Sequence, residues 1–277
     1  MRPFITILRP LNLLQATLAV VLTTAFLGEL TQVNILFLLI LSVISINGAG
    51  NIINDIYDLE IDRVNRPDRP LPSGSMSVAT ARIYLLILFA LGILFSWLIS
   101  VKAFLIAGPI SIPILVAYSV WFKRLPLVGN IAVSFMLGLA FIYVGAAFDN
   151  ISATLVMGAL AFGFTLIREI IKDLEDMDGD ARDNAHTLPV IWGEIQTRNF
   201  VLLLMVAFVF LDMLPYTFGI YNHIYLWMVN LGINIPLVVL GFSLWMYPNR
   251  KNYARVQLFL KLDIFVGLAA LYFGRIL

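Results

Sequence analysis

Long apolar stretches alternate with short polar segments along the whole chain, and each stretch has the length of a membrane-spanning helix. A span needs about 20 predominantly apolar residues. Pro109 and Pro113 lie inside the fourth stretch and predict a kink there. The pattern predicts an all-α fold, a polytopic membrane bundle of nine transmembrane helices, over residues 10–28, 35–57, 78–101, 103–122, 127–148, 154–174, 198–220, 224–247 and 255–276.

Two polar loops interrupt this pattern, one after the second predicted helix and one after the sixth. The first loop, residues 63–77, contains prolines and a glycine that end the helix and indicate an ordered loop. The second loop covers residues 175–196. Their segments NRPDRPLPSG and RDNAHTLPVIWG both contain Leu-Pro followed by a glycine. This similarity predicts an internal duplication, roughly 1–126 and 127–277, within a single transmembrane domain covering residues 1–277.

The second and sixth helices end in oxygen-bearing residues with identical spacing. In both, the positions follow offsets 0, 4, 7 and 11, which on a helix fall within an arc of roughly 60°. Negative charge at a helix C-terminus is unfavourable, and ionisable groups inside a membrane are costly and usually functional. We therefore expect functional stripes, and not solvated helix ends, at Asn51, Asp55, Asp58 and Asp62 and at Glu169, Asp173, Asp176 and Asp180.

Composition narrows the class of protein and the class of metal. The chain is 61% hydrophobic and 13% charged, whereas soluble domains are about 25% charged. A net charge of +1 gives no indication of a nucleic-acid partner. With no cysteine and only two histidines, disulfides, thiolate nucleophiles and cysteine-type zinc sites are excluded. Any metal is expected to be held by oxygen, which favours Mg²⁺, Mn²⁺ or Ca²⁺.

Basic residues are distributed unequally between the two ends of the predicted helices. Nine spans place the termini on opposite sides of the membrane. If the N-terminus is cytoplasmic, all of the 18 Lys and Arg residues except Lys102 and Arg275 lie at cytoplasmic ends. The positive-inside rule favours this orientation. We expect a multi-pass cell-membrane protein whose N-terminus and active site, with both stripes, are cytoplasmic.

The stripes and the basic residues near them together indicate a phosphorylated ligand. Crowded carboxylates repel one another unless a divalent cation lies between them. Mg²⁺ typically binds one or two carboxylates plus substrate phosphate oxygens. Carboxylates alone would suit a cation transporter, which is the alternative from a different class. The added basic residues favour a diphosphate held by Mg²⁺, with phosphate contacts expected from Arg63, Arg66, Arg69, Lys123, Arg124, Lys172 and Arg182.

Three segments, NDIYDLEID, NRPDRPLPSG and REIIKDLEDMDGD, resemble the UbiA superfamily of intramembrane prenyltransferases, and most of all its archaeal ether-lipid branch. The resemblance extends over nearly the whole chain through motif order and helix count. It implies an active site between the second and sixth helices and the loops that follow them. There, an isoprenyl diphosphate is bound through Mg²⁺, for which we expect as ligands Asn51, Asp55, Asp58, Asp173 and Asp176.

The same resemblance implies the reaction. A geranylgeranyl group would pass from geranylgeranyl diphosphate to the hydroxyl of geranylgeranylglyceryl phosphate, forming an ether in phospholipid biosynthesis. Asp62 and Asp180 are candidates to accept the hydroxyl proton. Family members carry a Tyr and a Lys at the cytoplasmic end of the fourth helix, and here Tyr118 and Lys123 stand one residue further apart than the usual Tyr-xxx-Lys spacing. Tyr118 is the third catalytic candidate.

Several alternatives stay open at this stage. The paired motifs recognise only the donor. An aromatic acceptor, such as a quinone or tetrapyrrole precursor, is therefore the alternative to a glycerol phosphate. Expected partners are the prenyl diphosphate, a lipid-like phosphorylated acceptor and the membrane, with no nucleic acid and no obligate protein partner. Gly48, Ala49 and Gly50 either make room for the prenyl chain or allow close helix packing. In the late helices, interhelical polar contacts are expected for Asp212, Lys261 and Asp263.

Overall fold

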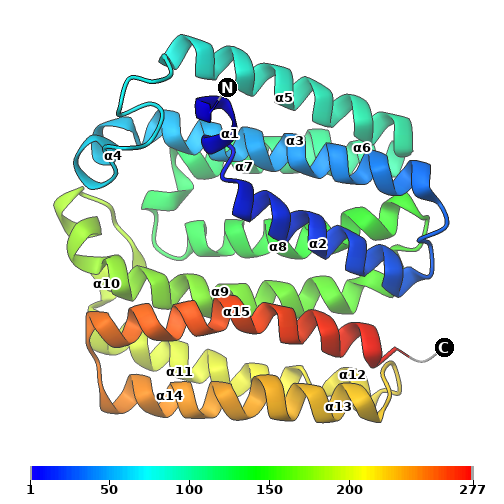
Figure 1. Cartoon of the computed structure of the whole chain (residues 1–277). Coiled ribbons are helices and arrows are strands. Elements are labelled where there is room, and N and C mark those ends of the chain that lie inside the picture. The colour runs from blue at the N-terminus through cyan, green and yellow to red at the C-terminus, as the bar shows by residue number, and fades with distance from the viewer. Residues whose placement is uncertain (1, 276–277) are drawn as a thin grey trace. The chain divides into compact units, whose positions relative to one another are not determined.

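The computed structural model describes residues 2–275, and regular secondary structure within them is helical apart from one isolated bridge between Tyr221 and Arg275. Nine helices in this described part are long and apolar enough to cross a membrane, as predicted (Figure 1). Ile276, the predicted end of the last helix, lies outside the described residues. The chain divides into two compact units, Met1–Phe122 with Leu139–Thr154 (unit 1) and Lys123–Gly138 with Leu155–Leu277 (unit 2).

Unit 1 is built around α3, which packs between α2 and α5 (Figure 1). The turn after α2 needs a glycine, because Gly28 has a φ of +80° and donates its backbone N–H to Ala25 O. Ser77 caps α5 by accepting a bond from the Thr80 N–H. The elements of unit 1 are α1 (Arg2–Thr6), α2 (Pro10–Leu27), α3 (Val33–Tyr57), α4 (Leu59–Asn65), α5 (Val78–Ile99), α6 (Val101–Leu105), η1 (Ile106–Ser111) and α7 (Ile112–Val120).

Small residues bring α3 and α5 close together. A Cβ atom on Gly92 would lie 2.5 Å from Ile46 Cγ1, and Ser42 Oγ donates to Gly92 O at 3.1 Å. A Cβ on Gly48 would likewise lie 3.0 Å from a Leu8 methyl, and one on Gly50 would lie 3.3 Å from a Leu115 methyl. Of the two interpretations left open, the structure supports close packing at these glycines.

The predicted kink in the fourth span takes the form of a π-helical turn. Pro109 lies inside η1, where it has no N–H to give to the helix ladder. Ser111 Oγ donates to Ile106 O at 2.8 Å and so satisfies a backbone carbonyl within the disturbed segment. The span continues into α7, so the kink leaves its length intact.

Unit 2 holds the later spans, in which α11, α14 and α15 run side by side (Figure 1). A second π-helical turn, η3, interrupts the eighth span and was not predicted. The remaining elements of the chain are η2 (Phe122–Arg124), α8 (Val128–Ala147), α9 (Ile151–Arg182), α10 (Leu188–Trp192), α11 (Glu194–Leu211), α12 (Leu214–Thr217), α13 (His223–Val229), η3 (Asn230–Asn234), α14 (Ile235–Met246) and α15 (Arg250–Phe273). Three of them, η2, α8 and α9, contribute residues to both units.

The predicted end of the sixth span was wrong by about two turns. The prediction placed it at Leu174, whereas α9 continues to Arg182. An apolar stretch indicates where a helix leaves the membrane, and the segment EDMDGDAR that follows contains no proline to end it. The whole second stripe therefore lies on one continuous helix.

Substitution Gly138→Ala tests the contact between α8 and α9 within unit 2. A Cβ there would lie 2.6 Å from Gly158 O, a backbone atom that cannot rotate away. Overpacking of this kind costs about 1–3 kcal/mol, so we expect the melting temperature in detergent to fall by roughly 5 °C. Gly241→Ala is the control, because its Cβ would meet Leu202 at an ordinary 3.5 Å. Equal melting temperatures for both variants would contradict the close contact.

Candidate active site

The first stripe lies at the end of α3 and on α4, in unit 1. Although α3 ends at Tyr57, Asp58 N–H donates to Asn54 O at 2.9 Å and Asp62 N–H to Asp58 O at 2.8 Å. These bonds keep the helical spacing across the break. Asn51, Asp55 and Asp62 are buried, and Asp55 is only 2% exposed. Three of the four stripe positions therefore face the protein interior.

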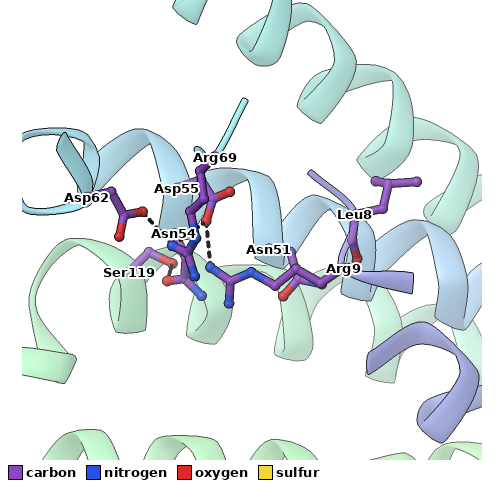
Figure 2. A network of polar contacts seen from close by, with 8 residues as sticks. All are labelled: Leu8, Arg9, Asn51, Asn54, Asp55, Asp62, Arg69 and Ser119. Carbon is purple, nitrogen blue, oxygen red and sulfur yellow. Dashed lines mark hydrogen bonds and ion pairs between the residues drawn. The ribbon is translucent and has the colours of Figure 1, made fainter. Parts of the chain in front are cut away.

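Two arginines hold the carboxylates of this stripe together (Figure 2). Asp55 Oδ1 accepts bonds from Arg9 Nη2 at 2.5 Å and from Arg69 Nη1 at 3.3 Å. Arg69 Nη1 also pairs with Asp62 Oδ2. Arg69, a predicted phosphate contact, thus bridges two stripe residues. We name Arg9, Asn51, Asp55, Asp62 and Arg69 the unit 1 cluster.

Arg9 was missed by sequence reasoning, although its setting is unusual. It has a φ of +54° immediately before Pro10, a left-handed conformation that costs roughly 1–2 kcal/mol for a residue with a Cβ. The turn joins α1 to α2, and the adjacent Leu8 carbonyl accepts a 2.9 Å bond from Asn51 Nδ2. The Arg-Pro pair before the first span was the available signal, but nothing in the sequence connects it with Asp55.

Substitution Arg9→Ala is expected to destabilise the protein more than loss of an exposed arginine. Loss of Arg9 leaves the buried Asp55 carboxylate with only the longer 3.3 Å contact to Arg69 among the ion pairs given above, at a cost of about 3 kcal/mol, and the melting temperature should fall by roughly 5–10 °C. Arg63→Ala is the matched control, since Arg63 pairs at 2.8 Å with Glu60 and both side chains are largely exposed. Similar losses in the two variants would show that the Arg9–Asp55 pair adds little.

The other predicted residues around the unit 1 cluster have varied settings. Asp58 is half-buried at the junction of α3 and α4, and Tyr118 is half-buried near the end of α7. The neighbouring Ser119 donates to Asn54 Oδ1 at 2.7 Å, which ties α7 to α3 and was not predicted. Arg63 and Arg66 are exposed on and after α4.

The second stripe lies on α9, in unit 2, with a different set of partners. Asp173 Oδ2 accepts a bond from Asn130 Nδ2 at 2.8 Å, and Asp180 Oδ2 accepts one from Thr187 Oγ1 at 2.9 Å. Asn130 and Thr187 were not predicted. We name Asn130, Glu169, Asp173, Asp176, Asp180 and Thr187 the unit 2 cluster.

Basic residues also border the unit 2 cluster. Buried Glu169 pairs with Arg168, and Lys172 Nζ lies 3.8 Å from Glu169 Oε2. The loop after α9 returns to η2, because His186 N–H donates to Arg124 O at 2.9 Å. This contact keeps Lys123 and Arg124 at the loop, while Arg182 is exposed at the end of α9. Asp176 is half-buried.

Both clusters have ligand atoms that suit Mg²⁺. Their acceptors are carboxylate and amide oxygens, the types that this ion binds. Across residues 2–275, no three acidic or histidine side chains converge closely enough to hold a metal by themselves. In the unit 1 cluster the arginines already neutralise Asp55 and Asp62. The residues therefore fit an ion that completes its coordination with phosphate oxygens brought by a substrate.

Comparison with known proteins assigns the family. Residues 14–262 match the UbiA prenyltransferase family. The chain belongs to this family. Digeranylgeranylglyceryl phosphate synthase of Methanosphaera stadtmanae is 33% identical over 276 residues, covering 100% of both chains. The enzyme of the same name from Thermococcus gammatolerans is 37% identical, covering 98% of this chain and 97% of that one.

Solved structures agree with this assignment. A structure of digeranylgeranylglyceryl phosphate synthase has a TM-score of 0.85 and 29% identity, covering 99% of this chain and 97% of that one. A UbiA homologue from Archaeoglobus fulgidus bound to DMAPP and Mg²⁺ has a TM-score of 0.68 and 19% identity, covering 96% and 99%. The predicted family, the all-α membrane fold and the multi-pass membrane location are confirmed. The predicted class of protein, a prenyltransferase, is confirmed over the alternative of a cation transporter.

Proposed function

We propose that this protein transfers a geranylgeranyl group from geranylgeranyl diphosphate to the hydroxyl of geranylgeranylglyceryl phosphate. The reaction forms the second ether bond of archaeal membrane lipids. The observation that carries this proposal is full-length similarity, at 33–37% identity, to enzymes named for this product. Both substrates would be lipid-like and phosphorylated, which suits clusters of acidic and basic residues on membrane-spanning helices.

Mg²⁺ is the cofactor that fits this reaction and these residues. The expected Mg²⁺ ligands are Asn51, Asp55 and Asp58 in unit 1, and Asp173 and Asp176 in unit 2. When bound, it neutralises the negative charge that develops on the departing diphosphate. A related UbiA homologue was solved with DMAPP and Mg²⁺, which supports the same cofactor here.

The arginines of the unit 1 cluster have a second role in the proposal. Without substrate, Arg9 and Arg69 neutralise Asp55 and Asp62. A bound diphosphate would offer these guanidinium groups phosphate oxygens in place of their carboxylate partners, since arginine binds both with similar fork geometry. Lys123, Arg124, Lys172, Arg63, Arg66 and Arg182 remain further candidates for phosphate contacts.

The acceptor hydroxyl must lose its proton as its oxygen forms a bond to carbon 1 of the prenyl chain and the bond from that carbon to diphosphate breaks. Asp62 pairs with Arg69, whereas the side chain of Asp180 accepts a bond from the neutral Thr187 hydroxyl. We therefore favour Asp180 as the proton acceptor. Tyr118, near the end of α7, stays a candidate for orienting substrate.

An acceptor assay tests the reaction directly. Purified protein would be incubated with radiolabelled geranylgeranyl diphosphate, Mg²⁺ and one acceptor at a time. We expect labelled product with geranylgeranylglyceryl phosphate and none when Mg²⁺ is removed with EDTA. Product only with an aromatic acceptor, such as a hydroxybenzoate, would overturn the proposed acceptor.

The proposal includes a cytoplasmic N-terminus and cytoplasmic acidic clusters, supported by the distribution of basic residues. Because the chain has no cysteine, single cysteines report topology cleanly. Thr31→Cys, between the first two spans, should react with a membrane-impermeant maleimide in intact cells, whereas Ser75→Cys should react only after lysis. Both positions are exposed. The reverse labelling pattern would invert the proposed orientation.

The internal duplication near residue 126 also belongs to this proposal. The shared offsets of the two stripes and the Leu-Pro loops after them support it. A duplicated origin explains why equivalent carboxylates recur once in each half of the chain.

A further inference from the structure

Asn130 is a buried polar residue that has no role so far in the proposed reaction. It lies in the first turn of α8 and is 6% exposed. Its Nδ2 donates to Asp173 Oδ2 at 2.8 Å, a normal length for such a bond. An ionised carboxylate only accepts hydrogen bonds, so the nitrogen of the amide faces Asp173. Both residues belong to unit 2, and Asp173 is an expected Mg²⁺ ligand.

Close packing of α8 against α9 brings this short side chain within reach of Asp173. Asn130, Ser134 and Gly138 follow one another at four-residue spacing, so they lie along one side of α8. All three are buried. A Cβ on Gly138 would lie 2.6 Å from the backbone oxygen of Gly158 in α9. The small residues on this side of α8 therefore let the two helices approach each other.

A hydrogen bond to one oxygen fixes the plane of the Asp173 carboxylate. The last side-chain torsion of aspartate has broad, roughly two-fold minima, so rotamer preference alone does not select one orientation. Asp173 is half-buried on α9, and Ile170 and Leu174 beside it are buried. Asn130 bonds Oδ2, and no other hydrogen bond involves this carboxylate among the described residues. The other oxygen, Oδ1, is therefore available to a metal ion.

The donor is neutral, so it orients Asp173 without cancelling its charge. In the unit 1 cluster, by contrast, arginines pair with Asp55 and Asp62. A guanidinium group competes electrostatically with a divalent cation for the same carboxylate, whereas an amide does not. The position of Asn130 in the first turn of α8 adds to this, because the partial positive charge at a helix N-terminus favours a nearby anion.

Partners behind metal ligands have measurable effects in other proteins. Such a partner orients the ligand, and its loss typically costs about 10–100-fold in metal affinity or activity. Mg²⁺ depends strongly on orientation, because it requires nearly ideal octahedral geometry. Thr187 makes a comparable 2.9 Å contact with Asp180, but Asp180 is the expected proton acceptor. The contact of Asn130 is therefore the one that bears on the metal.

We propose that Asn130 is a positioning residue for Mg²⁺, which holds Asp173 Oδ2 so that Oδ1 is presented to the ion. This inference rests on the proposed function, in which Asp173 is a metal ligand. Asn130 would touch neither the metal nor the substrates and would act only through Asp173. Loss of its amide would therefore weaken metal binding without removing a ligand.

Metal affinity tests this role apart from catalysis. Isothermal titration calorimetry would measure Mg²⁺ binding to purified protein saturated with geranylgeranyl thiolodiphosphate, an unreactive analogue of the donor. We expect Asn130→Ala to weaken Mg²⁺ binding by about 10–100-fold. Ser134→Ala is the matched control, because Ser134 is buried on the same side of α8 and its hydroxyl bonds only the helix backbone. Its Mg²⁺ affinity should stay within about twofold of wild type.

The Mg²⁺ dependence of turnover separates positioning from a purely structural role. Asn130→Ala keeps every expected ligand, so saturating Mg²⁺ should restore most of its kcat while its KM for Mg²⁺ rises. Asp173→Asn lacks a ligand and should not recover. Melting in metal-free buffer shows whether each variant is folded. If Asn130→Ala does not fold, Asn130→Leu fills a similar volume without a donor and takes its place.

Three outcomes would overturn the role of Asn130. One is an unchanged Mg²⁺ affinity in the folded variant, and another is a fall in kcat with an unchanged KM for Mg²⁺. The third is the absence of Mg²⁺ binding by the wild-type protein. Failure of wild-type protein to form product with any acceptor would instead contradict the proposed function, while calorimetry would still report on Asn130.

Discussion

The variant Asp55→Asn is expected to lose at least about 1,000-fold in turnover and also to lose stability. Asp55 is the expected metal ligand at the centre of the unit 1 cluster, and the neutral amide binds a divalent cation far more weakly. The same change removes the negative partner of Arg9 and weakens the contact with Arg69. Turnover over a range of Mg²⁺ concentrations and the melting temperature without Mg²⁺ measure the two effects separately.

Glu60→Gln is the control for this experiment. Glu60 lies five residues from Asp55, on α4, and its carboxylate is largely exposed beside Arg63. Removal of an exposed charge there should change turnover less than about twofold and stability by less than about 0.5 kcal/mol. Near-normal turnover of Asp55→Asn at saturating Mg²⁺ would rule out a metal-binding role for Asp55.

The variant Asp173→Asn is expected to lose turnover to a similar extent but to keep or gain stability. Asp173 receives a bond from Asn130, a neutral donor, and no lysine or arginine among the described residues lies within ion-pair distance of it. An asparagine of the same shape keeps an oxygen for Asn130 and removes a charge from apolar surroundings. The melting temperature without Mg²⁺ should therefore equal or exceed that of the wild type.

Asp178→Asn provides the comparison for Asp173, because Asp178 is exposed on the same helix. It should leave both turnover and melting temperature close to wild type. The two variants are expected to differ most clearly in melting temperature, which should fall for Asp55→Asn and stay equal or rise for Asp173→Asn. If Asp173→Asn destabilised the protein as much as Asp55→Asn, the carboxylate would have a structural role that its contacts do not reveal.

Features set by local spacing were predictable from sequence, whereas those set by distant contacts were not. The apolar lengths predicted nine spans, and the shared offsets indicated polar positions of which Asn51, Asp55, Asp62 and Glu169 are buried. Arg9 and Asp55 are 46 residues apart, and Asn130 and Asp173 are 43 apart. No periodicity links positions so distant, so these partners had to come from the folded chain.

Helix ends and π-helical turns could not be predicted from the sequence for a related reason. Hydropathy reports the transfer of side chains into lipid, and it is insensitive to whether the backbone remains helical outside the membrane. It therefore missed the last turns of α9. It also missed η3, because residues 230–234 lie inside a largely apolar stretch whose hydropathy does not distinguish a π-helical turn from an α-helix.

The length of α9 has a consequence for how amphipathic substrates are handled. Its 32 residues extend about 48 Å, whereas the hydrocarbon core of a bilayer is about 30 Å thick. Glu169 lies within the buried part of this rod, and Asp180 lies near its polar end. One continuous helix therefore places polar side chains on both sides of the boundary between the hydrocarbon core and water. Such a rod lets a charged headgroup stay hydrated and its hydrocarbon tail stay in lipid, so that neither needs to be extracted before reaction.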